Sequence, residues 1–282
     1  MKSFKKILIN VIAVVIALTA CLGLVACEDI KKLEVTISIY DTDESAVVEK
    51  TLTVDLYRHL APKTVDHIID TVEDGYYNNV LLYKDGNYIS QIMMGDYVYE
   101  NGEFKLNPVN VSTIDEEFKG TTGSNLKPTK GSIGLWRTWT AHADTYRDDG
   151  NLNTGKATWF MPESSLTSYD GWFTIFAQID FEDETNNETF NAIQKLIGTA
   201  NSSYKEYHAF YTGNYGTNGD GLTFNFLSDE EYDELDADAL NDIFKAEDDQ
   251  YVCYNKRVIR VPVATVGDVE QVTAIVKSVK VI

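Results

Sequence analysis

Histidine, cysteine and acidic side chains are the groups of this 282-residue sequence whose types could bind a metal or transfer a proton. The histidines, His59, His67, His142 and His208, share no spacing typical of metal ligands, and no cysteine–histidine set has zinc spacing. Two acidic segments, 41–44 and 180–184, could ligate calcium, but neither has the spacing of an EF-hand loop. The motifs of phosphate-binding loops, serine hydrolases and zinc proteases are missing. The sequence therefore predicts neither a metal nor a cofactor.

Cys27 ends the motif Leu24-Val25-Ala26-Cys27, which resembles the lipobox at which a bacterial lipoprotein is cut and diacylated. Three lysines and an apolar run over 7–20 precede it, which is the layout of a signal peptide. We expect a signal peptide over 1–26 and a lipid-anchored linker over 27–32. Cys21 ends a similar motif, but polar residues begin directly after Cys27, which favours Cys27. An uncleaved transmembrane anchor is the alternative, because about 20 apolar-rich residues can cross a bilayer.

Both interpretations place the rest of the chain outside the cytoplasm and tether it to the membrane. The formal charge is −20, from 24 Lys and Arg against 44 Asp and Glu. This charge argues against nucleic acid as a partner, because phosphate binding needs clustered basic residues. It also argues against attraction to anionic lipid. If Cys27 is lipidated, Cys253 has no partner, and no internal disulfide is expected.

Alternation of apolar and polar residues predicts many short strands. They span 33–40, 47–57, 80–84, 88–93, 131–137, 157–161, 172–179, 251–262 and 272–282. A helix is expected from Pro62 to Gly75, a short one over 187–196, and an acidic one over 228–244 that starts with a capping box of Ser228 and Glu231. No strand or helix is predicted within 97–130, 138–156 or 199–227. This element pattern predicts a closed antiparallel barrel.

An ordered series of short motifs runs through residues 33–198 and includes the last strand. Ala61-Pro62-Lys63-Thr64-Val65 and Gly75-Tyr76-Tyr77 resemble the A-P-K-T-V and G-Y-Y of the cyclophilin family. Further matches follow in the family's order, at 92–96, 116–118, 125–137, 157–161 and 169–176. The sequence is identified on this resemblance as a member of the cyclophilin family.

The resemblance implies a mostly-β fold, in which a closed eight-stranded antiparallel barrel is capped by two helices. The cyclophilin-like domain would span 33–282, with insertions at 97–113, 138–153 and about 199–250. It also implies cis/trans isomerisation of X-Pro peptide bonds, whose barrier of roughly 18–20 kcal/mol comes from amide resonance. An enzyme lowers it by binding the twisted amide better than either planar form. An apolar proline pocket, hydrogen-bond donors and a cation suffice, so the resemblance implies no cofactor.

Lys84 takes the position of the family's catalytic arginine in F-H-R, if the following turn carries one extra residue. The resemblance therefore implies that Lys84 is the catalytic cation, although lysine lacks the planar fork of arginine. An alignment without that gap puts Asp85 at this position. An ordinary solvated strand lysine is the alternative interpretation of Lys84.

Seven residues take the family's substrate-binding positions: Gln91, Met93, Arg137, Thr158, Phe160, Tyr169 and Phe173. Of these, Arg137 and Phe160 keep the family's residue type, whereas the pocket phenylalanine of the preceding strand is replaced by Ser90. A salt bridge is the alternative role for Arg137, and barrel core the alternative for Phe160 and Phe173. The four tryptophans, Trp136, Trp139, Trp159 and Trp172, are either a peptide-binding floor or packing residues.

Two functions follow as expectations. The first is an extracytoplasmic, lipid-anchored prolyl isomerase that acts weakly on proline-containing segments of exported proteins. The second is a catalytically impaired cyclophilin-like surface lipoprotein that binds peptides or proteins. The substitutions at Ser90, Gln91, Met93, Thr158 and Phe173 favour the second, and the ordered motifs favour the first.

Overall fold

The computed structural model describes residues 31–41, 43–86, 90–118, 126–137, 155–197, 204–212, 223–236, 238, 246–247, 250–251, 253–266 and 268–282. One compact unit runs from Lys32 to Ile282. The expected signal peptide, Cys21, Cys27 and Trp139 lie outside the described residues. Within the described part of the chain, no helix has both the length and the apolar character needed to span a bilayer.

Eight strands form a closed antiparallel barrel in the order β3-β15-β1-β2-β8-β6-β7-β4, which the pairing of β3 with β4 completes. They are β1 (Lys32–Asp41), β2 (Ala46–Leu56), β3 (Val80–Asp85), β4 (Gln91–Glu100), β6 (Ser132–Leu135), β7 (Trp159–Pro162), β8 (Ile175–Ile179) and β15 (Ala274–Val281). The predicted barrel is confirmed. Of the strand predicted over 88–93, residues 88 and 89 lie outside the described residues and Ser90 is in a turn, whereas β4 begins at Gln91 and runs on to Glu100.

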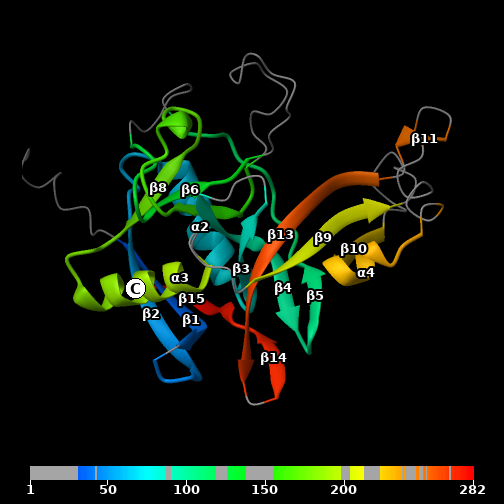
Figure 1. The fold of residues 1–282 in the computed structure, drawn as a ribbon. Coiled ribbons are helices and arrows are strands. Elements are labelled where there is room, and N and C mark those ends of the chain that lie inside the picture. The colour runs from blue at the N-terminus through cyan, green and yellow to red at the C-terminus, as the bar shows by residue number, and fades with distance from the viewer. Residues whose placement is uncertain are drawn as a thin grey trace, which may run out of the picture. The chain divides into compact units, whose positions relative to one another are not determined.

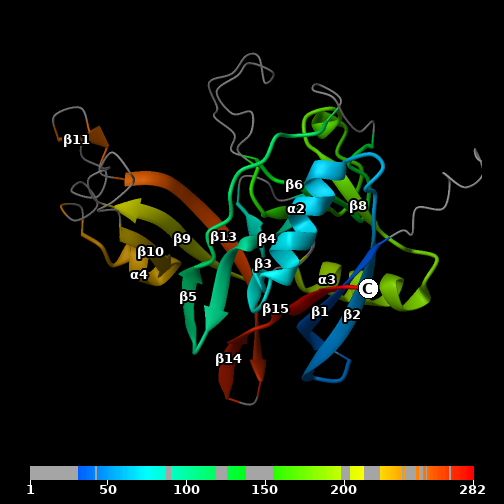
Figure 2. The same cartoon turned by 180° about the vertical axis from the view of Figure 1, so that it is seen from behind.

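Two helices lie on opposite sides of the barrel, α3 (Glu184–Ile197) in front in Figure 1 and α2 (Pro62–Glu73) in front in Figure 2. Val65 and Ile68 of α2, and Phe190 and Ile193 of α3, join the barrel's interior core. Strands contribute alternate residues to that core, since successive side chains of a strand point to opposite faces.

The start of α2 is stabilised by a residue far along the sequence. Pro62 occupies the first turn, and the residue before it, Ala61, offers no side-chain cap. Instead the carboxylate of Glu117 accepts hydrogen bonds from the backbone N–H groups of Thr64 and Lys63, at 2.7 and 3.2 Å. It also accepts one from the Thr64 hydroxyl, at 2.9 Å. The first turn of a helix has free N–H groups, so this buried carboxylate ties residue 117 to the helix.

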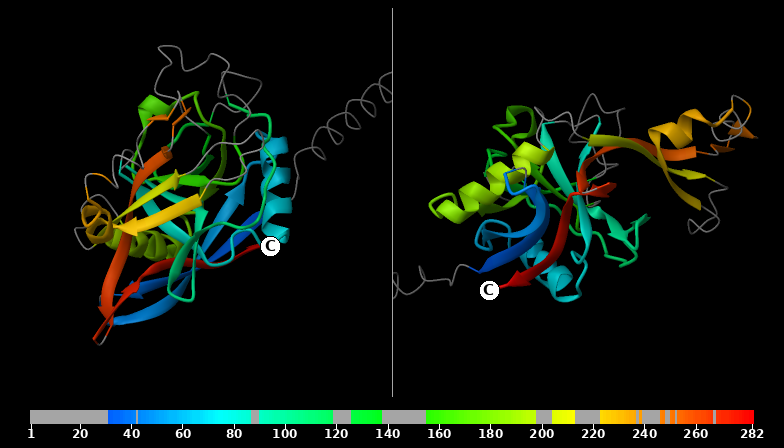
Figure 3. Two further views of the ribbon diagram at one scale, coloured as in Figure 1. Left: turned by 90° about the vertical axis from the view of Figure 1, so that its right-hand side faces the viewer. Right: turned by 60° about the horizontal axis from the view of Figure 1, so that its bottom comes forward.

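A three-stranded extension continues the barrel wall beyond β3, in the order β10-β9-β13. Figure 3 shows these yellow and orange strands leaving the barrel. They are β9 (Tyr204–Thr212), β10 (Thr223–Ser228) and β13 (Cys253–Val266). The expectation of no strand within 199–227 was wrong. Tyr207 and Ala209 alternate with His208 and Phe210, and both faces of β9 are covered.

Shorter elements complete the described chain. They are β5 (Glu103–Leu106), η1 (Thr167–Tyr169), α4 (Asp229–Asp233), β11 (Ala246–Glu247), β12 (Gln250–Tyr251) and β14 (Val269–Val272). The expectation of no strand within 97–130 was therefore wrong at 97–100 and 103–106. The capping box of Ser228 and Glu231 is confirmed, but α4 ends at Asp233 and residues 234–236 are not helical, so the helix predicted over 228–244 is interrupted there. Residues 237 and 239–244 of that prediction lie outside the described residues. An acidic run without opposite charges or an apolar stripe does little to extend a helix.

Candidate functional site

A second apolar cluster lies on the outer face of the barrel wall. Along β3, β4 and β7, Leu82, Met94 and Trp159 belong to the interior core, whereas their neighbours Tyr83, Met93 and Phe160 belong to the second cluster. Alternation along each strand puts the two sets on opposite faces. We call this second set the outer cluster; it comprises Leu81, Tyr83, Met93, Tyr97, Trp136, Phe160, Phe173, Ile175, Ala209, Ile259 and Val261.

Four aromatic rings gather at one end of the outer cluster. The Phe160 ring lies 5.1 Å from Phe173, 5.9 Å from Trp136 and 5.9 Å from Tyr169, between ring centroids. Trp136 stacks on Phe173 at 5.2 Å, and Tyr169 is 4.9 Å from Phe173. We call these four residues the aromatic site. The structure thus brings together Phe160, Tyr169 and Phe173, which the sequence had singled out.

Gly134 makes room for the Phe160 ring. Gly134 pairs with Phe160 between β6 and β7. A Cβ at this position would lie 2.3 Å from Cε1 and Cζ of Phe160, far inside van der Waals contact. The ring lies over the glycine, so the shape of the aromatic site depends on this missing side chain.

Arg137 is the cation that the structure places at the aromatic site. Its guanidinium carbon lies 5.7 Å from the Phe173 ring centroid and 5.0 Å from that of Phe118, the range of cation–π contact. Nη1 is 3.9 Å from Oε2 of Glu116, so the ion pair that was the alternative role is present together with the ring contacts. Burial lowers the pKa of Arg137, and Glu116 opposes that shift. Arginine nevertheless remains charged at neutral pH.

Met93 and Gln91 extend the site along β4. Two residues apart, they leave the strand on the same face, and Nε2 of Gln91 is 3.8 Å from Sδ of Met93. Gln91 is 1% exposed. Its Oε1 accepts no hydrogen bond from the described part of the chain.

Thr158 belongs to a polar network centred on Asp96. Its hydroxyl donates to Oδ1 of Asp96 at 2.5 Å, and the Tyr83 hydroxyl donates to Oδ2 at 2.5 Å. Nη1 of Arg257, from β13, lies 3.5 Å from the same Oδ2. Burial lowers the pKa of Arg257, but the charges of Asp96, Tyr83, Tyr97 and Asp85 together outweigh that effect, so the pKa is raised. One carboxylate therefore joins β3, β4, the segment before β7 and the extension.

Lys84 lies outside the aromatic site. Its ammonium group forms an ion pair with Glu163, and only 4% of the side chain is exposed. The interpretation of Lys84 as a solvated lysine is therefore wrong. Burial lowers the pKa of Lys84, although Glu163 opposes the shift. The pairing of β3 with β4 sets Tyr83, not Lys84, opposite Met93. The catalytic role of Lys84 stays a prediction.

Sequence reasoning assigned no role to Tyr83, Asp96 or Glu116. The alignment with F-H-R gave a role to Lys84 and none to its neighbour Tyr83. The alternation of Leu81 and Tyr83 against Val80 and Leu82 was the available signal, since it puts a tyrosine on the face of Met93. Asp96 and Glu116 gave no such signal, because their partners are distant in the sequence.

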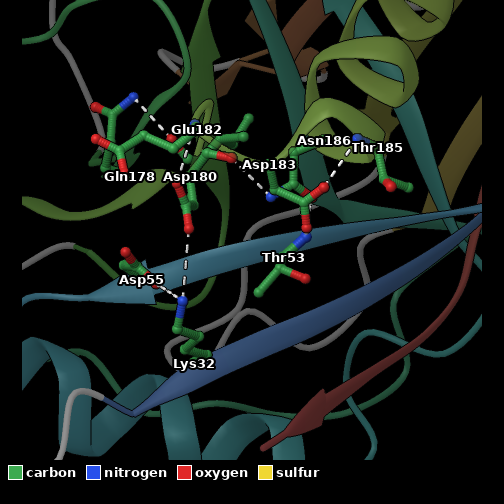
Figure 4. A network of polar contacts seen from close by, with 10 residues as sticks. Lys32, Thr53, Asp55, Gln178, Asp180, Glu182, Asp183, Thr185 and Asn186 are labelled. Carbon is green, nitrogen blue, oxygen red and sulfur yellow. Dashed lines mark hydrogen bonds and ion pairs between the residues drawn. The ribbon is translucent and has the colours of Figure 1, made fainter.

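The acidic segment 180–184 has structural contacts instead of a ligand set. Figure 4 shows the Asp180 carboxylate facing Lys32, which also pairs with Asp55 at 2.9 Å. Asp183 accepts from the Thr185 N–H at 2.8 Å, at the start of α3. Asn186 bridges the Asp180 carbonyl and the Thr53 N–H. Across the described residues, no group of three or more His, Cys, Asp or Glu side chains is placed to hold a metal ion.

The closed barrel is the fold that the cyclophilin resemblance implied, and three of the residues that it assigned to substrate binding, Phe160, Tyr169 and Phe173, lie together on the outer wall. The family described as "Cyclophilin type peptidyl-prolyl cis-trans isomerase/CLD" matches residues 40–208, more than half of the chain. The chain therefore belongs to the cyclophilin-type peptidyl-prolyl cis-trans isomerase family.

Two individual proteins are similar to it. The chain is 24% identical over 141 residues to peptidyl-prolyl cis-trans isomerase B of Escherichia coli (strain K12), a match covering 50% of this chain and 75% of that protein. A crystal structure of a cyclophilin type peptidyl-prolyl cis-trans isomerase from Cryptosporidium parvum matches with a TM-score of 0.38 and 16% identity. That match covers 71% of this chain and 97% of the other.

Proposed function

We propose that this chain is an extracytoplasmic peptidyl-prolyl cis-trans isomerase of low turnover, which acts on proline-containing segments of exported proteins. The aromatic site receives the proline ring. The observation that carries this proposal is the convergence of Phe160, Phe173 and Met93 on one outer face of the barrel, with Arg137 against the Phe173 ring. An apolar surface for a ring and a fixed cation beside it are two of the parts that isomerisation needs.

Hydrogen-bonding groups for the peptide backbone lie beside the rings. The carboxamide of Gln91 is next to Met93, and its Oε1 is buried and accepts no hydrogen bond from the described residues, so it would reach a peptide N–H only after the side chain turned outward. The Thr158 hydroxyl donates a hydrogen bond to Asp96, so the lone pairs of the Thr158 oxygen remain available to accept one from the peptide. These groups would hold the peptide while the X-Pro bond turns.

We assign the role of the cation to Arg137 in preference to Lys84. Arg137 contacts the Phe173 ring, whereas Lys84 is engaged by Glu163. A guanidinium already buried beside Glu116 has less freedom to meet the amide nitrogen than an unpaired one. We therefore expect turnover about two orders of magnitude below that of a family member with the full motif, or about 3 kcal/mol of lost transition-state stabilisation.

A prolyl isomerisation assay on the purified full-length chain in detergent tests the proposal. We expect catalysis above the uncatalysed rate that falls at least tenfold in Arg137→Gln and stays within twofold in the matched Arg58→Gln variant. Arg58 forms an exposed ion pair with Asp66. Both residues are far in the sequence from the residues of the aromatic site. A Lys84→Met variant in the same assay decides between the two cations. A rate lost only in Lys84→Met would overturn the assignment to Arg137.

A second candidate function is peptide or protein binding without turnover. The observation that favours it is that Lys84, Arg137 and Arg257 each already pair with a carboxylate. If no variant and no wild-type preparation accelerates isomerisation, but a proline peptide binds and Phe160→Ala abolishes that binding, this second function is the correct one.

The lipid anchor has its own test. It is supported by the lysines and apolar run before Leu24-Val25-Ala26-Cys27. Labelled fatty acid should be incorporated by the wild-type chain and the Cys21→Ser variant expressed in a bacterial host, and not by Cys27→Ser. Labelling that survives in Cys27→Ser but is lost in Cys21→Ser would move the anchor to Cys21.

A further inference from the structure

The outer cluster does not stop at the aromatic site. Tyr83 lies 5.1 Å from Tyr97, between ring centroids, and Tyr97 lies 6.0 Å from Phe224 and 5.6 Å from Phe226. Both phenylalanines belong to β10 of the extension. A continuous buried apolar cluster therefore leads from Met93 along β4 to the partly exposed rings of the extension, beyond residue 208, where the family match ends.

Four partly exposed aromatic residues lie at the end of this cluster: Phe104 of β5, Tyr207 of β9, and Phe224 and Phe226 of β10. We call them the aromatic shelf. Phe104 stacks on Phe226 at 4.5 Å and lies 4.8 Å from Tyr207. Their partial exposure distinguishes them from Ile259 and Val261, which are fully buried in the same cluster.

The other face of the extension has a different partner. His208 stacks on Tyr232 of α4 at 3.8 Å, and Phe210 meets the same ring edge-on at 6.2 Å. Because β9 alternates, Tyr207 and Ala209 must leave the strand on the side of the barrel. One face of the extension is thus closed by α4, and the other joins the outer cluster.

The shelf is held in register with the aromatic site. Arg260 and Ile259 of β13 pair with Lys84 and Asp85 of β3. The Gly86 N–H donates to the Val258 carbonyl at 2.6 Å. Arg257 pairs with Asp96, which also anchors Tyr83 and Thr158. The extension is therefore fastened to the same strands that carry the site.

We propose that the aromatic shelf binds a bulky apolar or aromatic side chain of the substrate, close in sequence to the proline that occupies the aromatic site. This inference rests on the proposed function and names its substrate class: extended segments that carry a large apolar residue near proline. Met93 and Tyr97 are four residues apart on β4, at most about 13 Å because the strand is irregular at Gly95, and an extended peptide spans that separation in about four residues.

The test uses synthetic peptides on the full-length chain in detergent. The parent is a fluorescein-labelled peptide with one proline in an alanine–serine background. In a series of otherwise identical peptides, phenylalanine is placed two to five residues before or after the proline. We expect at least one position to lower Kd on the order of tenfold, because a buried aromatic anchor contributes strongly to binding.

Two matched variants test whether the aromatic shelf provides the gain in affinity. Phe226→Leu should abolish the gain from phenylalanine and leave the Kd of the parent peptide unchanged. Phe210→Leu, on the face covered by α4, removes the same atoms from the extension and should keep the gain. A gain that survives in Phe226→Leu, or a wild-type chain that binds the parent and every member of the series equally, overturns the inference and leaves the proposed function standing. If neither the parent nor the series binds, both fail.

Photo-crosslinking tests the shelf without any substitution in the protein. The best peptide of the series carries benzoylphenylalanine in place of phenylalanine. Adducts should map to fragments that contain β5 or β10. Adducts found only in other fragments would overturn the inference, whether or not the Phe226→Leu variant folds.

Discussion

The hydroxyl of Tyr83 donates a 2.5 Å hydrogen bond to Oδ2 of Asp96, so the residue opposite Met93 is linked to the carboxylate that also accepts from Thr158. Tyr83 is fully buried. Burial, reinforced by the Asp96 charge, raises the pKa of Tyr83 well above its ordinary value. The phenol therefore stays a donor, and it fixes one wall of the candidate site.

Removing that hydroxyl leaves a charged acceptor with one donor fewer. We expect Tyr83→Phe to lower the free energy of unfolding by about 2 kcal/mol, since hydrogen bonds to charged groups contribute roughly 1.5–3 kcal/mol. Urea denaturation followed by fluorescence measures it. Tyr40→Phe, on β1 outside the outer cluster, is the control and should change stability by less than about 0.5 kcal/mol. Equal losses in both variants would contradict the role of Asp96.

The raised pKa of Tyr83 predicts that stability falls at alkaline pH. A group whose pKa is raised on folding contributes stability that is present below its unfolded pKa, about 10 for tyrosine, and lost as pH rises through the folded value. The wild-type chain should lose more stability than Tyr83→Phe as pH rises above about 10. Parallel urea titrations at neutral and alkaline pH test this. A difference that does not shrink with rising pH would refute it.

The Lys84–Glu163 pair should be strongly coupled. Their side chains are 4% and 13% exposed, so removal of one leaves the other charge buried. We expect Lys84→Met and Glu163→Leu to cost about 3 kcal/mol each, and the double variant to cost much less than their sum. A double-mutant cycle in urea measures the coupling. Additive losses would show that the pair contributes no net interaction.

Gly134→Ala should displace the Phe160 ring. The added Cβ would lie 2.3 Å from ring atoms, which must move. We expect a loss of about 1–3 kcal/mol in stability, as for overpacked cores, together with weaker binding of a proline peptide. Phe160→Leu in the same chain should recover part of the stability, because the smaller side chain frees the space. Wild-type peptide affinity in Gly134→Ala would argue against Phe160 as part of the site.

Glu117 should matter for α2 through its hydrogen bonds. Glu117→Ala removes the acceptor of three donors at the helix start, and we expect a loss of about 2 kcal/mol. Glu117→Gln keeps one acceptor oxygen and should lose less. Thermal unfolding compares the two. Asp115→Ala, two residues away and exposed, is the matched control.

Local features were predictable where a pattern decided them. The alternation of Leu33, Val35, Ile37 and Ile39 predicted strand β1. A proline and a glycine predicted the ends of helix α2, and the order of the short motifs predicted the barrel that the structure has. The capping box at Ser228 was also predictable, because its two residues are three apart. Phe160, Phe173 and Tyr169 were selected from the sequence and lie together.

Contacts between residues far apart in the sequence were decided only by the tertiary structure. The sequence by itself determined the strand-rich barrel, the acidic charge and the aromatic residues of the site, because these depend on local periodicity and composition. The tertiary structure placed Lys84 against Glu163, put Tyr83 opposite Met93, and joined Arg257 to Asp96 across 161 positions of the chain. Strand register and burial set these contacts, and neither is encoded within the short windows that a motif or a periodicity samples.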